Sequence, residues 1–300
     1  GFAAAWLLCA AMWAAPSAQQ PGAFRAGIDL VTLHVVVRDR GGELVPDLSV
    51  DDFELREDGV PQAVRYFARG DGPAADLHLG LLLDVSESMS EDIAFTRTAS
   101  IRFVHTMEEA RDVTLVDFDT QVRAARFSPA EYPRLIERIR QQKVQGDTAL
   151  FDAVGLYLDG AAEQDGRKVM LLYTDGGDTR SSLRLHELVD LVKASDVTIY
   201  AVGVNPASAL RTRAEQQSVL RQIAGAAGGE VFFPPTARDL DRVYGQIAAD
   251  IRASYTLGFE STNARADGRW RKLDVRLARP ERRGLKVRAR PGYYAPLRRP

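Results

Sequence analysis

The chain has 300 residues, and 45% of them are hydrophobic, which is enough for the core of one large domain or of two smaller ones. Its formal net charge of −2 excludes a global electric field that would attract nucleic acid or an anionic membrane. Arginine is concentrated after residue 264, where acidic residues are few. We expect these arginines to lie on solvated strand faces rather than on a polyanion-binding surface.

The N-terminal segment FAAAWLLCAAMWAA, residues 2–15, is apolar and uncharged. It is shorter than the about 20 residues that a membrane-spanning helix needs, and its length is typical of a signal peptide. We therefore expect a signal peptide over residues 1–18, with its basic n-region missing; a buried helix or an uncleaved anchor is the alternative. Cys9, the single cysteine, lies in this segment, so the exported chain would contain no disulfide. Export without disulfides favours a bacterial protein of the periplasm, the cell envelope or the medium.

The segment that follows has the pattern of β-strands. LVTLHVVVRD, residues 30–39, is rich in β-branched residues that roughly alternate with others. DFELREDG and QAVRYFAR lie on either side of a turn at Asp58 and Gly59, which predicts a hairpin. Residues 70–76, GDGPAAD, are typical of a linker.

From residue 77 to residue 254 strands and helices alternate. LHLGLLLDV, residues 77–85, is a continuous apolar run, as expected for a strand that is buried on both faces. The alternation predicts an open, mostly parallel, doubly wound α/β sheet with helices on both faces. Helices are expected over residues 92–107, 130–142, 149–163, 183–195, 213–229 and 237–254, and further strands over 112–118, 121–127, 167–174, 197–204 and 230–234.

Strands return after residue 254, in YTLGFES, RWRKLDVRLAR and GLKVRARPGYY. Neither flank of the α/β region has enough strands to bury a core alone. We therefore expect residues 19–75 and 254–297 to form one small β-sandwich, with the α/β domain of residues 76–253 inserted between its halves. A separate N-terminal unit is the alternative.

Carboxylate and hydroxyl side chains follow several predicted strands. Asp84, Ser86 and Ser88 end the first strand of the α/β region, Thr148 precedes a helix, and Asp175 ends another strand. Ligands bind at the carboxyl ends of the strands in open α/β sheets. Hard oxygen ligands select Mg²⁺, Mn²⁺ or Ca²⁺ over softer metals. Taken alone, the first three residues could instead cap the following helix.

The order D-x-S-x-S, a later threonine and a strand-terminal T-D-G resembles the von Willebrand factor type A domain and its metal-ion-dependent adhesion site. The resemblance covers residues 77–254, and the flanks resemble secreted bacterial VWFA-related proteins, known largely from acidobacteria. It implies Mg²⁺, with Ca²⁺ or Mn²⁺ as alternatives, and one coordination position left for a ligand's Glu or Asp. Asp147 stands where many relatives have glycine. The implied direct ligands are Ser86, Ser88 and Thr148, while Asp84 and Asp175 would coordinate directly or through water.

The resemblance implies a non-enzymatic, exported binding or adhesion module that holds a protein ligand through an acidic side chain. Tyr173, Asp178 and Arg180 lie near the site in sequence and are expected to contact that ligand. Nucleic acid is not an expected partner, and a membrane is expected only through an uncleaved N-terminal segment. One alternative is a structural envelope component with a rigidifying metal. A metal-dependent phosphoester hydrolase is disfavoured because no G-x-x-x-x-G-K-[ST] or G-x-S-x-G motif occurs.

Overall fold

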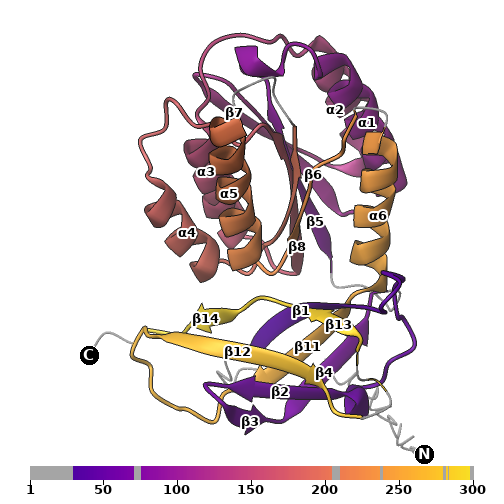
Figure 1. Ribbon diagram of the computed structural model, residues 1–300, viewed down its shortest axis with the longest axis vertical. Coiled ribbons are helices and arrows are strands. Elements are labelled where there is room, and N and C mark those ends of the chain that lie inside the picture. The colour runs from indigo at the N-terminus through magenta and orange to yellow at the C-terminus, as the bar shows by residue number, and fades with distance from the viewer. Residues whose placement is uncertain are drawn as a thin grey trace, which may run out of the picture.

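The computed structural model describes residues 30–70, 76–204, 210–236, 239–279, 282 and 284–297. The predicted signal peptide lies outside these ranges. Figure 1 shows two parts, an α/β domain and a β-sandwich that lies against one end of it. Within the described ranges, none of the helices has both the length and the apolar character that a membrane span requires.

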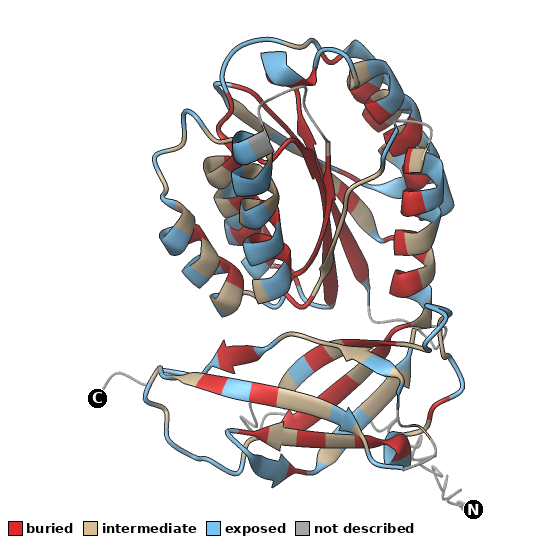
Figure 2. Cartoon of the chain, viewed as in Figure 1, coloured by how far each residue is buried: buried red, intermediate tan, exposed pale blue. Residues whose placement is uncertain are grey.

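The α/β domain is built on a central sheet with the strand order β10-β9-β8-β5-β6-β7. β7 runs antiparallel to β6, and the other neighbouring pairs are parallel. Every residue of β5, β8 and β9 is buried, as expected for apolar strands between two layers of helices (Figure 2). The strands are β5 (Leu77–Asp84), β6 (Asp112–Phe118), β7 (Val122–Phe127), β8 (Arg167–Thr174), β9 (Thr198–Gly203) and β10 (Glu230–Phe232).

Helices cover both faces of this sheet, which confirms the predicted fold class. One core lies under α1 (Ile93–Thr106), α2 (Tyr132–Gln141) and α6 (Leu240–Ala253). The other lies under α3 (Leu150–Ala162), α4 (Leu185–Ala194) and α5 (Leu210–Ala226). Short 3-10 turns occur at Val50–Asp52, Glu87–Met89 and Pro129–Glu131.

The order of the strands places a topological switch point beside the end of β5. From β5 the chain continues to β6 on one side, and it later returns to β8 on the other side. The sheet therefore changes its direction of winding between β5 and β8, and the carboxyl ends of such strands are where open α/β sheets bind ligands. Asp84 and Thr174 are the last residues of these two strands.

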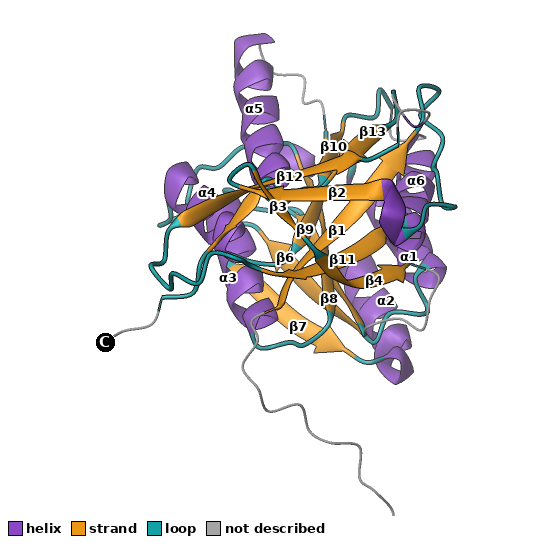
Figure 3. Cartoon of the chain, turned by 90° about the horizontal axis from the view of Figure 1, so that it is seen from below, coloured by secondary structure: helices purple, strands orange, loops and turns teal. Residues whose placement is uncertain are grey.

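The flanking strands form a sandwich of two antiparallel sheets with a shared apolar core. β1 pairs with β11, and β2 pairs with β12, so each sheet combines strands from before and after the α/β domain. Figure 3 views the molecule from this side, with the sandwich strands crossing in front of the α/β domain. One sheet has β13 (Lys286–Arg288), β1 (Leu30–Arg38), β11 (Tyr255–Glu260) and β4 (Val64–Arg69). The other has β14 (Gly292–Tyr294), β12 (Trp270–Leu277), β2 (Phe53–Glu57) and β3 (Val60–Gln62).

Two predicted strand segments of the sandwich each divide between its two sheets. The predicted hairpin turn at Asp58 and Gly59, both with positive φ, is present between β2 and the short strand β3, but its second arm ends there and β4 crosses to the other sheet. The segment GLKVRARPGYY also divides, because β13 and β14 belong to different sheets. Pro291, between them, has no N–H to donate and so cannot extend a strand ladder.

Arginine side chains join the sandwich to the floor of the α/β domain. The last turns of α4, α5 and α6 face the sandwich (Figure 1), and helix C-termini carry unpaired carbonyls with a partial negative charge. From the sandwich side, Arg288 Nη1 donates to Gly228 O at 3.0 Å and Arg290 Nη2 donates to Lys193 O at 3.1 Å. Within the α/β domain itself, Arg167 Nη1 at the start of β8 donates to Ile251 O in the last turn of α6 at 2.6 Å.

The expectation that the late arginines lie on solvated faces was therefore wrong for several of them. Arg288 and Arg290 bind main-chain carbonyls of the α/β domain. Arg271 is 3% exposed and pairs with the equally buried Glu57 at 2.9 Å inside the sandwich. These residues neutralise buried acceptors, which composition alone does not reveal.

Candidate metal site

The first part of the site is the turn that follows β5. Asp84 is fully buried, and its Oδ1 accepts a hydrogen bond of 3.0 Å from the Ser86 N–H. The hydroxyl oxygens of Ser86 and Ser88 lie 3.2 Å apart. The turn therefore folds back over its own carboxylate and brings the two alternate hydroxyls together, as the D-x-S-x-S spacing predicts.

The second part is the end of β8. The Thr174 hydroxyl donates a hydrogen bond of 2.6 Å to Asp84 Oδ2 and accepts one of 3.1 Å from the Gly176 N–H. Asp175 Oδ1 accepts a hydrogen bond of 2.7 Å from the Gly177 N–H. Gly176 has a φ of 84°, which favours glycine, and this turn keeps Asp175 beside the end of β5.

The third part is the loop before α3, which is hydrogen-bonded to the other two. The Glu87 N–H donates to Gly146 O at 3.1 Å, which links this loop to the turn after β5. The Thr148 N–H donates to Thr179 Oγ1 at 3.0 Å, and the Thr179 N–H donates to Thr148 O at 2.9 Å. The structure thus brings the segments of all five predicted ligands, Asp84, Ser86, Ser88, Thr148 and Asp175, to one edge of the sheet.

The two carboxylates of this site are buried, and no described residue gives them a cationic partner. Asp84 is 0% exposed and Asp175 is 5% exposed, and neither pairs with a lysine or arginine of the described ranges. Burial, helped by the charge of Asp175 and opposed by hydrogen bonds from Ser86 and Thr174, raises the pKa of the Asp84 carboxyl group to about 6.

This charge distribution fits a divalent cation, which would supply the missing positive charge. In the described part of the chain, no three His, Cys, Asp or Glu side chains come together to hold a metal ion. A cation bound here would therefore use hydroxyl oxygens as well as the two carboxylates. Hydroxyl and carboxylate oxygens suit Mg²⁺, Mn²⁺ and Ca²⁺.

The three residues that were expected to contact a protein ligand lie in different environments. The prediction for Tyr173 was wrong, because its side chain is 1% exposed and packs in the core on the α1 and α6 side of the sheet. Asp178 Oδ1 accepts a hydrogen bond of 3.2 Å from the Phe151 N–H in the first turn of α3, so it caps that helix. Arg180 is exposed, and its contact with a ligand stays a prediction.

Thr174 and Thr179 were missed as members of the site. Thr174 is fully buried at the end of a buried strand, where a hydroxyl group must find a hydrogen-bond partner. That position could have suggested a role next to Asp84. Thr179 gives no comparable signal, because it is an exposed residue of a polar loop.

Replacing Thr174 by valine is expected to weaken binding of Mn²⁺ by about 10- to 100-fold, the usual effect of removing a group that orients a metal ligand. Valine preserves the shape of the side chain but removes the donor to Asp84 Oδ2. Isothermal titration calorimetry measures the affinity. Thr106→Val is the control, because the Thr106 hydroxyl donates to the Arg102 carbonyl on α1, away from the site. Equal affinity of both variants would show that Thr174 does not orient Asp84.

Comparisons with known proteins identify the family of the α/β domain. The sequence model of the von Willebrand factor type A domain matches residues 78–246. The vWF domain of the type V pili tip protein Mfa5 from Porphyromonas gingivalis is 12% identical, with a TM-score of 0.50 over 59% of this chain and 95% of the other. The pilus adhesin SpaC from Lactobacillus rhamnosus GG, in an open conformation, is 11% identical, with a TM-score of 0.52 over 82% of this chain and 48% of the other.

At such low identity these likenesses show the fold alone. No curated protein sequence matches the chain. The match to the sequence model, in contrast, spans more than half of the 300 residues and includes all three loops of the site. The chain therefore belongs to the von Willebrand factor type A domain family.

Proposed function

We propose that this chain is an exported, non-enzymatic binding module that holds a protein partner through a divalent cation at a metal-ion-dependent adhesion site. The observation that carries the proposal is the burial of Asp84 and Asp175 side by side without a cationic partner among the described residues. Family membership supports it. So does the presence of a pilus tip protein and a pilus adhesin among the similar folds.

The chemistry of the donor set favours binding of an acidic partner. The hydroxyls of Ser86, Ser88 and Thr148 and the carboxylates of Asp84 and Asp175 would hold Mg²⁺, with Mn²⁺ or Ca²⁺ as alternatives. When bound, the cation supplies a position for an acidic side chain of the partner. Because hydroxyls are neutral, two carboxylates leave the site without excess negative charge, so a third carboxylate from outside is not repelled.

The same three loops favour binding over catalysis. The segments 84–90, 145–149 and 174–181 contain no His, Cys or Lys. They therefore offer no imidazole general base and no thiol or amine nucleophile. A structural role of the metal predicts something different, namely that Mg²⁺ raises the melting temperature without creating any binding.

A capture experiment from the native cell envelope tests the proposal. The immobilised chain is expected to retain a protein partner in Mg²⁺, to lose it in EDTA, and to lose it in the Asp84→Ala and Thr148→Ala variants. Amidation of carboxyl groups in the extract should also abolish capture. Asp147→Ala is the matched control, because Asp147 is an exposed carboxylate next to Thr148. Partners retained equally under all these conditions would overturn the proposal.

A further inference from the structure

A cleft between the sandwich and the floor of the α/β domain lies at the opposite end of the strands from the metal site. One cavity of about 370 Å³ lies between the outer face of β1, β4 and β11 and the segment that leads into β8. A second cavity of about 400 Å³ extends toward Arg290, Tyr293 and Tyr294. Both cavities are lined by Leu30, Thr32, Lys168 and Asp196. Together they form what is called here the interdomain cleft.

Positive charge exceeds negative charge in the interdomain cleft. Among the described residues that line it, the cationic side chains are Arg69, Arg167, Lys168 and Arg290, and the carboxylates are Asp165 and Asp196. Lys168 Nζ lies 2.6 Å from Asp196 Oδ2, but Asp196 is 47% exposed at the mouth. Four cations against two carboxylates leave an excess of two positive charges.

The arginines of the cleft form no ion pair with a carboxylate of the described ranges. Arg167 is 9% exposed, its Nη1 donates to the Ile251 carbonyl, and its Nε has no hydrogen-bond partner among the described residues. Arg290 donates to main-chain carbonyls, those of Gly292 and Lys193. Arg69 lines the cleft from the end of β4. A buried guanidinium group that meets only carbonyl oxygens stays charged and has no counter-ion.

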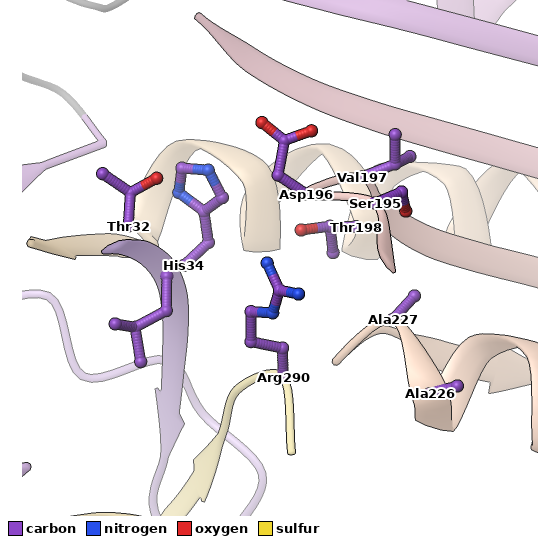
Figure 4. A pocket seen from close by; sticks show the side chains of 10 residues that line it. Thr32, His34, Ser195, Asp196, Val197, Thr198, Ala226, Ala227 and Arg290 are labelled. Carbon is purple, nitrogen blue, oxygen red and sulfur yellow. The ribbon is translucent and has the colours of Figure 1, made fainter. Parts of the chain in front are cut away.

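The pKa of His34 is affected by the positive side chains of the cleft. Its side chain lines the cleft. Figure 4 shows a small adjoining pocket, where the imidazole lies near the Arg290 guanidinium, Asp196 and Thr198. Burial, followed by the charges of Arg167, Arg290 and Lys168, lowers the pKa of His34 well below its usual value. Both effects favour the neutral imidazole, burial more strongly and the neighbouring positive charges in addition.

We propose that the interdomain cleft binds a small organic anion that carries two or more carboxylate or phosphate groups. Its volume lies within the range of small-molecule sites, about 300–1,000 Å³. Guanidinium groups bind both kinds of oxyanion with paired hydrogen bonds. Two anionic groups match the excess of two positive charges, with Arg69 and Arg167 in one cavity and Arg290 in the other. Both domains line the cleft, so the bound anion also stabilises their arrangement.

Isothermal titration calorimetry of the full chain with citrate and with pyrophosphate tests the proposal. The buffer contains no divalent cation, and its ionic strength is held constant with sodium chloride. The wild-type chain binds at least one of the two anions, and the stronger ligand shows whether the cleft prefers carboxylate or phosphate. Arg69→Ala weakens binding by about tenfold, since one charge-assisted hydrogen bond is lost. Thr32→Asp, at an exposed position on the cleft, abolishes binding by adding a carboxylate.

Two further variants distinguish binding in the cleft from binding at the metal site or on the open surface. Arg65→Ala removes an exposed arginine of the same strand that does not line the cleft, and it should leave the affinity unchanged. Asp84→Ala should also leave it unchanged, because the metal site lies at the other end of the sheet. No binding of either anion would overturn the proposal. Equal weakening by Arg65→Ala and Arg69→Ala would also overturn it, because it would show general attraction of anions to the surface.

Discussion

Replacing Asp250 by alanine is expected to lower the free energy of unfolding by about 3–5 kcal/mol, the usual cost of removing one partner of a buried ion pair. Asp250 lies on α6 and is fully buried. Its carboxylate accepts hydrogen bonds from Arg38 on β1 and from Arg288 on β13, the latter at 2.6 Å. Alanine would leave Arg38 at the domain interface without a carboxylate partner among the described residues, and Arg288 with only Glu230, at 3.6 Å.

Chemical denaturation followed by circular dichroism measures this effect. Asp241→Ala is the matched control, because Asp241 lies on the same helix and pairs with Arg102 in an exposed position. Exposed pairs contribute about 0–1 kcal/mol, so the control should change the free energy of unfolding little. Similar small losses in both variants would show that solvent reaches Asp250 and that the interface is not a tightly packed contact.

This cluster of charges also shows a limit of prediction from the sequence. Arg38 lies 212 residues before Asp250, and Arg288 lies 38 residues after it. Each of these residues has the pattern of an ordinary solvated charge in its own strand or helix. Only the docking of the sandwich onto the helix ends brings them together, and no local pattern encodes that docking.

The central sheet, in contrast, was predictable, because the apolar pattern of its strands and their place between two layers of helices require the same structure. The apolar run of residues 77–83 is long enough for one strand, and a strand that is apolar on both faces requires cover on both sides. The sandwich strands were predicted less well. Whether β4 stays beside β3 or crosses to β11 depends on packing between the two sheets, which the alternation of residues within one strand does not record.

Some residues of the candidate site could likewise be placed from the sequence, and others could not. The spacing in D-x-S-x-S fixes a local turn, so Asp84, Ser86 and Ser88 could be placed together from the sequence. The contribution of Thr174 depends on the register between β5 and β8, which sets the hydrogen bond from its hydroxyl to Asp84. Tyr173 was misassigned because the alternation of side chains in β8 points its ring into the core.

Asp84→Asn is expected to make the metal-free chain more stable at pH 7 by about 1–3 kcal/mol, because a buried charge next to Asp175 is removed. The pKa of Asp84, raised to about 6, shows that the fold disfavours its charged form. Asparagine keeps an oxygen for the Ser86 N–H, and the Thr174 hydroxyl can reverse to accept a hydrogen bond from the new amide.

The same substitution is expected to abolish the response to the cation. Mg²⁺ should stabilise the wild-type chain by mass action, by about 2.7 kcal/mol at 100 times its dissociation constant, and should leave Asp84→Asn unchanged. The order of stability would then invert once the Mg²⁺ concentration is high enough. Chemical denaturation with and without Mg²⁺ measures both effects, and Asp147→Asn is the control, because this neighbouring carboxylate is exposed. Equal stabilisation of Asp84→Asn and the wild type by Mg²⁺ would place the cation elsewhere. A metal-free variant less stable than the wild type would instead show that Asp84 is held mainly by its hydrogen bonds.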